Sequence, residues 1–382
     1  MDFKDIKKIL VIKLRHIGDV LLSVPVFRAL RENFPQAHIA ALVNSGTEEV
    51  LTGNPLINEI IVFDRSIKKM NPVQRYMREF SFLKNIRAKG FDMAVDLTSG
   101  DRAAIISFIS GAKYKLAYDL GRDGFLGKRH LYTHLAKKDG SQHMVLQNLD
   151  VVKQFGISTD NLTVNLFIPE DARQFVKKIL EEDGIPPHPH LGKGGTWVGK
   201  VVHVHPVSRW LFKCWKDEYM AEVISWLINN GIKVIVTSSP DKKEMDKAKK
   251  ILSLIGDSPD STARPPLMGG IGGVIDLCGM TTIKQLAAIS EASDLFLGVD
   301  SAPMHIAAAV GTPVIALFGP TGEVQWGPWG KNHKVFAKDM ECKPCKSGVC
   351  DEFDLRRCLE MITKEEVIDA LSSALGLESH KN

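Results

Sequence analysis

Short apolar segments alternate with stretches of helical periodicity along the whole chain. Each apolar segment has the length of a buried strand, and they lie at residues 8–13, 38–43, 59–63 and 92–97, then at 201–205, 233–237, 274–277, 294–298 and 314–318. Apolar residues at helical spacing lie between them, in residues 20–33, 216–230, 242–254 and 282–292. Strands that alternate with helices predict an α/β fold in which helices cover both faces of a parallel sheet.

The alternation is interrupted around residues 186–200, where proline and glycine are too dense for a regular element. We therefore predict two Rossmann-like α/β/α domains, with an N-terminal domain at 1–185, a hinge loop at 186–200, a second domain at 201–360 and a C-terminal segment at 361–382. That last segment contains one expected helix, 363–375. A second stretch rich in Pro, Gly and Ser, residues 257–273, predicts a surface loop.

The most informative stretch begins where a buried strand ends at Asp300-Ser301. An alanine-rich helix follows, and the next strand begins at Val314, so the chain makes a right-handed crossover between parallel strands. Ligands of such sheets bind at the carboxyl ends of the strands, and a helix N-terminus there favours a phosphate. Asp300 or Ser301 can instead be a plain N-cap. A cap does not explain His305, which lies on the helix face of Ser301, so this stretch predicts a nucleotide-phosphate site.

Residues 298–305 read Gly-Val-Asp-Ser-Ala-Pro-Met-His, followed by Gly-Thr-Pro at 311–313 and Phe-Gly-Pro-Thr at 318–321. This combination resembles the donor-site signature of the ADP-heptose:lipopolysaccharide heptosyltransferases, glycosyltransferase family 9. The resemblance implies a GT-B fold with an acceptor-binding first domain, a nucleotide-sugar-binding second domain and a final helix that can pack back on the first. It makes Asp300, Ser301, Ala302 and His305 expected donor contacts, although Ser301-Ala302 replaces the Thr-Gly of some members.

A second candidate segment, Arg15 to Ser23, follows the first strand. Gly18 permits a tight turn there, and Asp19 can be a helix cap or a reactive carboxylate. The segment is similar to the Gly-Asp-Val/Leu-Leu motif that opens the heptosyltransferases, which implies that Asp19 is the general base of an inverting transfer. Such a base removes the proton of the attacking hydroxyl. Arg15 is then an expected acceptor contact.

The third candidate segment is the loop after the strand 201–205. Ser208 and Arg209 can reach a pyrophosphate, and Lys213 can stabilise the charge that grows on a leaving diphosphate. Lys213 as a solvated helix residue is the plainer alternative. Ser208, Lys213 and Trp215 match the Thr/Ser, Lys, Trp pattern of the heptosyltransferases, so the resemblance implies a catalytic role for Lys213.

Further contacts rest on weaker patterns. Asp241 or Glu244 can accept a hydrogen bond from a ribose hydroxyl, although a cap is the better interpretation of Asp241. Met280 lies in residues 279–282, a segment that resembles the one whose backbone meets the adenine but that can also be a turn and helix N-cap. Arg102 can bind an acceptor phosphate, and His143 matches a His that recurs before a long helix in the family, so both are expected acceptor contacts.

Net charge and hydropathy bear on the cellular compartment and on the class of binding partner. The net charge of +4 is too small to indicate nucleic acid, but it is compatible with an anionic substrate or membrane surface. No apolar run reaches the ~18 residues of a membrane span, and the acidic N-terminus is unlike a signal peptide. We expect a cytoplasmic protein, and peripheral contact with the inner membrane stays open. Four cysteines are clustered late in the chain, at Cys342, Cys345, Cys350 and Cys358. They can bind a structural metal or remain as reduced thiols.

The expected activity is therefore metal-independent transfer of heptose from ADP-heptose to the inner core of lipopolysaccharide. The motif at 206–215 and the donor signature are most similar to the type III enzymes, which add a branching heptose to the second heptose. Two other classes stay open. A nucleotide-sugar epimerase shares the architecture but needs no acceptor, and a non-catalytic nucleotide- or carbohydrate-binding protein would tolerate loss of Asp19.

Overall fold

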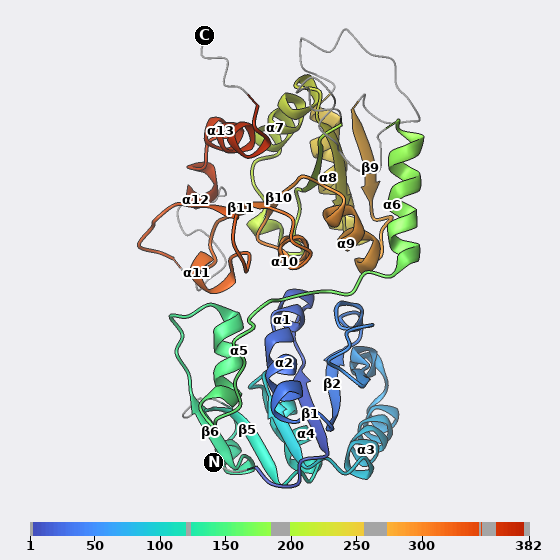
Figure 1. The fold of residues 1–382 in the computed structure, drawn as a ribbon, viewed down its shortest axis with the longest axis vertical. Helices are drawn as coiled ribbons and strands as arrows, with labels where there is room; N and C mark the ends of the chain where they lie inside the picture. Colours follow the sequence, from blue (N-terminus) through green and yellow to red (C-terminus); the bar gives the residue numbers. More distant parts are fainter. Residues whose placement is uncertain are drawn as a thin grey trace. The chain divides into compact units, whose positions relative to one another are not determined.

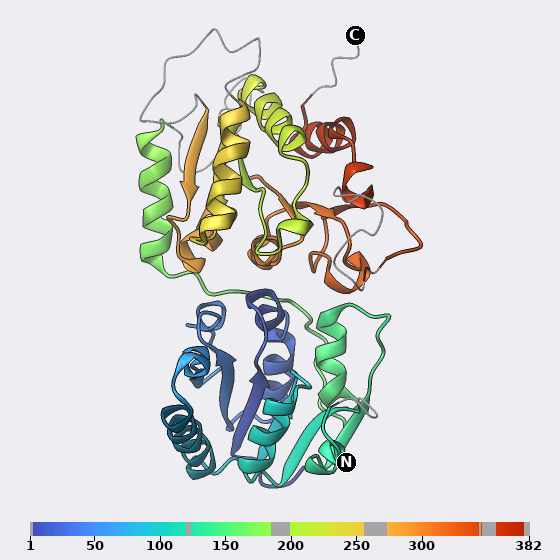
Figure 2. The same ribbon diagram turned by 180° about the vertical axis from the view of Figure 1, so that it is seen from behind.

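In the computed structural model the chain forms two units, Met1–Phe167 and Ile168–Asn382, each built on a parallel sheet (Figures 1 and 2). The structure describes residues 3–119, 124–184, 199–255, 273–343, 345 and 357–377. The predicted loop 257–273 lies almost wholly outside these residues, as does most of the predicted hinge 186–200. Among the described helices, none is both long enough and apolar enough to cross a bilayer.

Unit 1 has six strands in the order β3-β2-β1-β4-β5-β6. Their bounds are β1 Lys8–Lys13, β2 His38–Asn44, β3 Glu59–Phe63, β4 Met93–Asp96, β5 Tyr114–Asp119 and β6 His134–Lys137. The helices are α1 Ile17–Leu21, α2 Val24–Asn33, α3 Pro72–Ala88, α4 Asp101–Ile109 and α5 Met144–Lys153. The central strand β1 is buried after its first residue, since helices cover both faces of a parallel sheet.

The helix predicted at 20–33 is two helices in the structure, α1 and α2, because proline interrupts it. Pro25 has no N–H with which to continue the hydrogen bonds of α1, and it occupies the first turn of α2 instead. The Ser23 hydroxyl donates to the carbonyl of Val20 at 2.6 Å between the two helices. Because of this break, α1 is a separate short helix that follows directly after β1 and contains Asp19.

Unit 2 has six strands in the order β12-β11-β10-β7-β8-β9. Their bounds are β7 Val201–His205, β8 Lys233–Ser238, β9 Val274–Cys278, β10 Leu295–Val299, β11 Val314–Phe318 and β12 Lys334–Ala337. The helices are α6 Glu170–Glu182, α7 Asp217–Asn229, α8 Lys242–Ile255, α9 Ile283–Glu291, α10 Ala302–Ala309, α11 Glu323–Trp326, α12 Arg357–Glu360 and α13 Lys364–Leu375.

The predicted α/β architecture and all of the predicted strands are present, whereas β5, β6 and β12 were not predicted. These three are at or next to a sheet edge, where polar residues are tolerated and the apolar signal is weak. The division between the units also differs from the prediction, because it falls after Phe167 rather than at 185. Helix α6 lies in unit 2, where Arg173 binds the Glu291 carboxylate through two N–H groups at 2.7 and 2.9 Å.

The expectation that the final helix can pack back on the first domain is corrected by the structure. Helix α13 packs against α7 in unit 2, and its Val367, Leu371 and Leu375 join the hydrophobic core of that unit. The Nε1–H of Trp215 donates to the carbonyl of Ile362 at 3.1 Å, immediately before the helix. An apolar stripe at helical spacing shows that one face of a helix is buried, but it does not show which domain covers that face. The sequence pattern alone therefore did not identify the partner of α13.

This packing predicts that Leu371→Ala destabilises unit 2 by about 2–5 kcal/mol, since the side chain is fully buried and a cavity remains. All six tryptophans lie between residues 197 and 329, so urea unfolding followed by tryptophan fluorescence reports on this unit. Ser373→Ala, at an exposed position of the same helix, is the matched control and should change stability by less than about 0.5 kcal/mol. Equal effects of the two substitutions would contradict the packing of α13 in the core.

Candidate active site

The carboxyl ends of β7, β8, β10 and β11 form one polar edge of the unit 2 sheet. The register pairs Gly298 with His205 and Val299 with Leu317, so the segments after these strands begin at the same level. At Gly298 a Cβ atom would lie 2.9 Å from the carbonyl oxygen of His205. Glycine therefore lets β10 and β7 approach closely at the place where the segment 300–305 leaves the sheet.

An ion pair links two of these segments. The Lys213 Nζ lies 2.7 Å from the Asp300 Oδ2, and the Thr321 hydroxyl donates to the same oxygen. The Ser208 hydroxyl is directed at the Asp300 carbonyl at 3.4 Å. Asp300 is buried, so these contacts fix the position of the ammonium group. Ser208, Lys213 and Asp300 are therefore brought together, from three places in the sequence.

The N-terminus of α10 adjoins this ion pair. Ser301 is the N-cap residue by backbone geometry, but its hydroxyl donates to the Val299 carbonyl at 3.2 Å and does not cap the helix. Ala302 is the first residue of the helix, and His305 is buried one turn on. The backbone N–H groups and the positive end of the helix dipole at Ala302 suit an anionic oxygen.

The other predicted donor contacts are Arg209, in the loop after β7, and Glu244 and Met280, which follow β8 and β9. Arg209 is exposed, and its guanidinium lies 5.7 Å from the centre of the Trp210 ring. Glu244 is buried in the first turn of α8; burial raises the pKa of its carboxyl, while hydrogen bonds from Ser239 and the charge of Arg209 oppose that shift. Met280 is exposed just after β9. Asp241 accepts from the backbone N–H of Lys243 at 3.0 Å, so the capping interpretation of this residue agrees with the structure.

A buried histidine pair under this edge was not predicted. The Thr237 hydroxyl lies 2.7 Å from the His203 Nε2 and 2.8 Å from the His205 Nδ1, and the His203 Nδ1 lies 2.8 Å from the Ser290 hydroxyl. Burial lowers the pKa of His205 to about 3 and that of His203 well below its ordinary value. Both rings are therefore neutral near pH 7. The sequence feature that could have revealed this pair is the presence of two histidines at alternate positions of an otherwise apolar strand.

In unit 1, Asp19 is the third residue of α1 and is half-buried. The helix begins after His16, so Asp19 is not its N-cap. Below α1, the Lys13 ammonium donates to the Leu97 carbonyl at 3.0 Å and to the Asn148 side-chain oxygen at 2.8 Å. Burial lowers the pKa of Lys13 to about 8, and the charge of Asp19 acts in the opposite direction. Sequence reasoning missed Lys13, although a lysine at the end of a buried strand is unusual.

The turn after β4 lies next to Lys13, because its Leu97 carbonyl accepts the hydrogen bond from the Lys13 ammonium. The Asp96 carboxylate accepts from the backbone N–H groups of Thr98 at 2.7 Å and Ser99 at 3.0 Å, and from the Tyr132 hydroxyl at 2.5 Å. Burial raises the pKa of Asp96, and these hydrogen bonds oppose the shift. The Arg15 guanidinium donates to the Thr98 carbonyl at 3.1 Å. Arg15 is thus fixed to the turn that precedes α4.

The other two predicted acceptor contacts make local contacts of their own. The Arg102 guanidinium lies 3.1 Å from the Glu79 carboxylate and 4.6 Å from the centre of the Phe63 ring. The His143 Nδ1 accepts from the Val145 N–H at 3.2 Å and caps α5. Their acceptor roles stay predictions.

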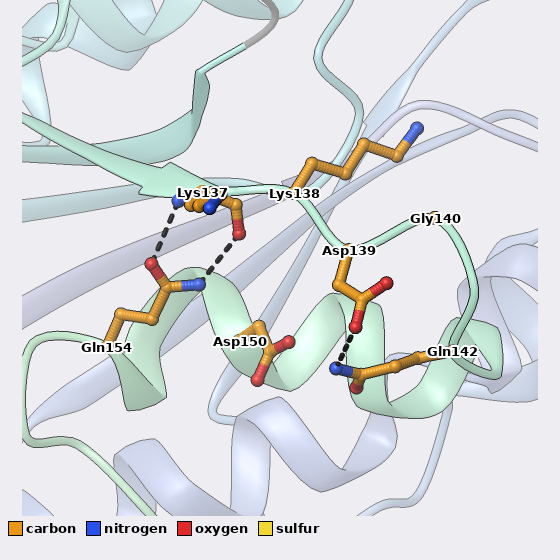
Figure 3. A pocket seen from close by; sticks show the side chains of 7 residues that line it. All are labelled: Lys137, Lys138, Asp139, Gly140, Gln142, Asp150 and Gln154. Atoms are coloured by element: carbon orange, nitrogen blue, oxygen red, sulfur yellow. Dashed lines mark hydrogen bonds between the residues drawn. The ribbon is translucent and has the colours of Figure 1, made fainter.

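A surface pocket of about 490 Å³ lies along α5 (Figure 3). Its lining residues come from the end of β6, the following turn and α5, namely Lys137, Lys138, Asp139, Gly140, Gln142, Asp150 and Gln154. Figure 3 shows the Gln142 side chain donating to the Asp139 carboxylate, a 2.9 Å bond that draws this turn over the start of α5. Apart from Gly140, the lining residues of the pocket carry charged or amide side chains, and Gln142 directly precedes His143 in the sequence.

The clustered cysteines differ in their surroundings. Cys358 is buried in the core of unit 2, Cys342 is exposed and Cys345 is half-buried, while Cys350 lies outside the described residues. Within the described ranges, no group of three or more His, Cys, Asp or Glu side chains is arranged to hold a metal ion.

Comparisons with known proteins give a consistent match. The model of glycosyltransferase family 9 (heptosyltransferase) matches residues 79–354. Lipopolysaccharide heptosyltransferase 3 of Escherichia coli is 31% identical over 95% of this chain and 97% of its own. The crystal structure of the glycosyl transferase family 9 protein from Veillonella parvula has a TM-score of 0.77, with 22% identity and 99% of both chains covered. The structure of E. coli heptosyltransferase WaaC with ADP-2-deoxy-2-fluoro heptose has a TM-score of 0.68, with 18% identity over 96% of this chain and 99% of that one.

The buried histidines predict a specific sensitivity to acid. The unfolded chain binds a proton at position 205 as the pH falls below about 6.5, whereas the folded protein does not do so until about pH 3, so stability falls on acidification. Between pH 7 and pH 5 the wild type should lose about 2 kcal/mol more stability than His205→Gln. Urea unfolding followed by tryptophan fluorescence measures the difference. Parallel pH profiles of the two proteins would contradict a neutral, buried His205.

Proposed function

Because the chain belongs to glycosyltransferase family 9, the heptosyltransferase family, we propose that it transfers heptose from ADP-heptose to the inner core of lipopolysaccharide with inversion. The observation that carries the proposal is the ion pair of Lys213 with Asp300 beside the N-terminus of α10. It places a fixed cation and a helix dipole at one sheet edge, which suits a diphosphate. The 31% identity to a heptosyltransferase over nearly the whole chain supports heptose as the sugar.

The donor binds unit 2 in this proposal. Its diphosphate lies at Lys213, Ser208 and the first N–H groups of α10, with Arg209 as a further cation. The buried Glu244 accepts from the ribose hydroxyls, and Met280 lies against the adenine. Asp300 is itself an anion and repels phosphate at short range, so it acts on the donor by holding Lys213 in place.

The chemical step needs stabilisation of the leaving ADP. The bond between C1 of the heptose and the diphosphate oxygen breaks as the acceptor oxygen attacks C1, and negative charge accumulates on the diphosphate. Lys213 is held by Asp300, so it need not reorient during the reaction. We propose that protein cations and the helix dipole supply this stabilisation, without a metal.

Asp19 is the proposed general base, which takes the proton of the acceptor hydroxyl. Asp19 is half-buried on the short helix α1, directly after β1. The buried Lys13 ammonium, at the end of β1, is fixed by its hydrogen bonds to the Leu97 carbonyl and the Asn148 side chain. Lys13 is therefore proposed as a positioning residue, because it ties the strand before α1 to the turn after β4 and to α5.

The acceptor is proposed to be the lipopolysaccharide inner core, with the second heptose receiving a branching third heptose. The similarity to a heptosyltransferase 3 supports this step. Arg15, Arg102 and His143 of unit 1 are its proposed contacts, and the cytoplasm is the proposed compartment. An epimerase or a non-catalytic binding protein would consume or bind the nucleotide sugar without any core acceptor.

Substitution of the proposed base gives a direct test. Asp19→Asn should lower kcat/KM for heptose transfer by about 10²–10⁴-fold, because the acceptor hydroxyl keeps its proton. ADP affinity, measured by calorimetry, should be unchanged since Asp19 lies in the other unit. ADP release that depends on acceptor identifies a transferase. Near-normal transfer by Asp19→Asn would exclude this residue as the base, and turnover without acceptor would favour the epimerase.

Removal of the fixed cation should have a different effect. Lys213→Met should reduce kcat by about 10²–10³-fold and weaken ADP binding, because the diphosphate loses its cation and Asp300 is left unpaired. Lys178→Met, on the exposed face of α6, is the matched control and should leave both quantities unchanged. Single-turnover rates and calorimetry measure the two effects. A Lys213→Met enzyme with full kcat would contradict the proposed role.

A further inference from the structure

Helix α3 of unit 1 carries an apolar stripe on its outer face. Val73, Tyr76, Met77 and Phe80 expose 69%, 73%, 65% and 60% of their surface. Their spacing of three and four residues places them on one face of the helix. The rings of Tyr76 and Phe80 stack on each other, 6.5 Å apart, along this face. Figures 1 and 2 both show α3 at the periphery of unit 1.

This stripe is not the face that anchors the helix. Phe82, Leu83 and Ile86 pack on the core of unit 1. Phe82 and Ile86 lie on a different side of α3 from the outer stripe, and Leu83 lies at the border between the two faces. The helix therefore has one apolar face for folding and a second that stays in contact with water. Contiguous apolar side chains on a surface indicate a binding face more often than chance exposure.

The positive charge around the stripe indicates an anionic binding partner. Residues 65–89 contain eight Lys or Arg and one acid, Glu79, so this segment carries a formal charge of +7 while the whole chain carries +4. Lys84 and Arg87 follow Phe80 at helical spacing and continue the stripe as exposed cations, whereas the exposed Arg78 lies about 100° further round the helix than Met77. Glu79 is engaged by Arg75 at 3.5 Å and by Arg102 at 3.1 Å.

We propose that α3 docks unit 1 on an anionic phospholipid bilayer, with the stripe in the interface and Lys84 and Arg87 at the lipid phosphates. An amphipathic helix with aromatic residues on one face and cations beside them binds in this way. A second copy of the chain is a poorer partner, because two such helices would bring their cations together. A surface helix of this kind needs no membrane-spanning segment.

Docking also has a consequence for catalysis, and this consequence alone rests on the proposed function. The lipid-anchored acceptor is confined to a membrane surface, so an enzyme bound to the same surface encounters it more often. Loss of docking should therefore reduce transfer to acceptor in vesicles and leave transfer to a delipidated, soluble core oligosaccharide unchanged.

Sedimentation of the purified full-length protein with vesicles tests the docking itself. Wild type should bind vesicles that contain about one-third phosphatidylglycerol, and Tyr76→Ser/Phe80→Ser should lower this affinity by about tenfold or more. Lys84→Glu/Arg87→Glu should lower it by about fivefold or more per cation and make it less dependent on salt. Unchanged thermal unfolding shows that the variants are folded.

Matched controls separate the helix from general effects of apolarity and charge. Met361→Ser removes an exposed apolar side chain in unit 2, and Lys177→Glu/Lys178→Glu reverses two charges on α6. Both should bind vesicles like the wild type. The proposal is overturned if the wild type does not sediment with anionic vesicles, or if the α3 variants bind as well as the controls. It is also overturned if the stripe variants abolish self-association in sedimentation equilibrium while vesicle binding persists.

Discussion

All strands within each sheet are parallel, and this constraint determines where the chemistry of the protein lies. Parallel strands end at one edge, so residues far apart in sequence meet there. Loops after β7, β10 and β11 contribute Lys213, Asp300 and Thr321 to one cluster in unit 2. The loops after β1 and β4 bring Arg15 and Thr98 together in unit 1. Neither cluster would exist if the register of the central strands shifted, because the segments would leave the sheet at different levels.

Buried polar groups support both edges. In unit 2 the Thr237 hydroxyl joins two neutral histidines under the proposed phosphate site. In unit 1 the Lys13 ammonium ties β1 to the turn after β4 and to α5 through Leu97 and Asn148. Each group is costly to bury, and each is satisfied by hydrogen bonds, so each network holds the sheet edge of its own unit in one geometry. The stabilisation of charge during the reaction depends on that rigidity.

Most of the fold could be predicted because buried parallel strands give continuous apolar runs. The break between α1 and α2 was missed because proline is accepted in the first turn of a helix, so Pro25 did not by itself indicate that one helix ends and another begins. The predicted position of α13 was wrong because an apolar stripe shows that a helix face is buried without showing which domain covers it. The motif residues Ser208, Lys213 and Asp300 were found from spacing and family resemblance. Their ion pair, and the supporting Lys13 and Thr237, depend on contacts across the sheet that a single sequence does not encode locally.

The central claim is that this glycosyltransferase adds one heptose to the inner core, and mass spectrometry of the product tests it most directly. Wild-type protein would be incubated with ADP-heptose and two purified core acceptors, one that ends at the second heptose and one that lacks it. The account predicts a mass gain of one heptose on the first acceptor and none on the second. Unchanged masses for both acceptors, with ADP-heptose intact, would contradict it.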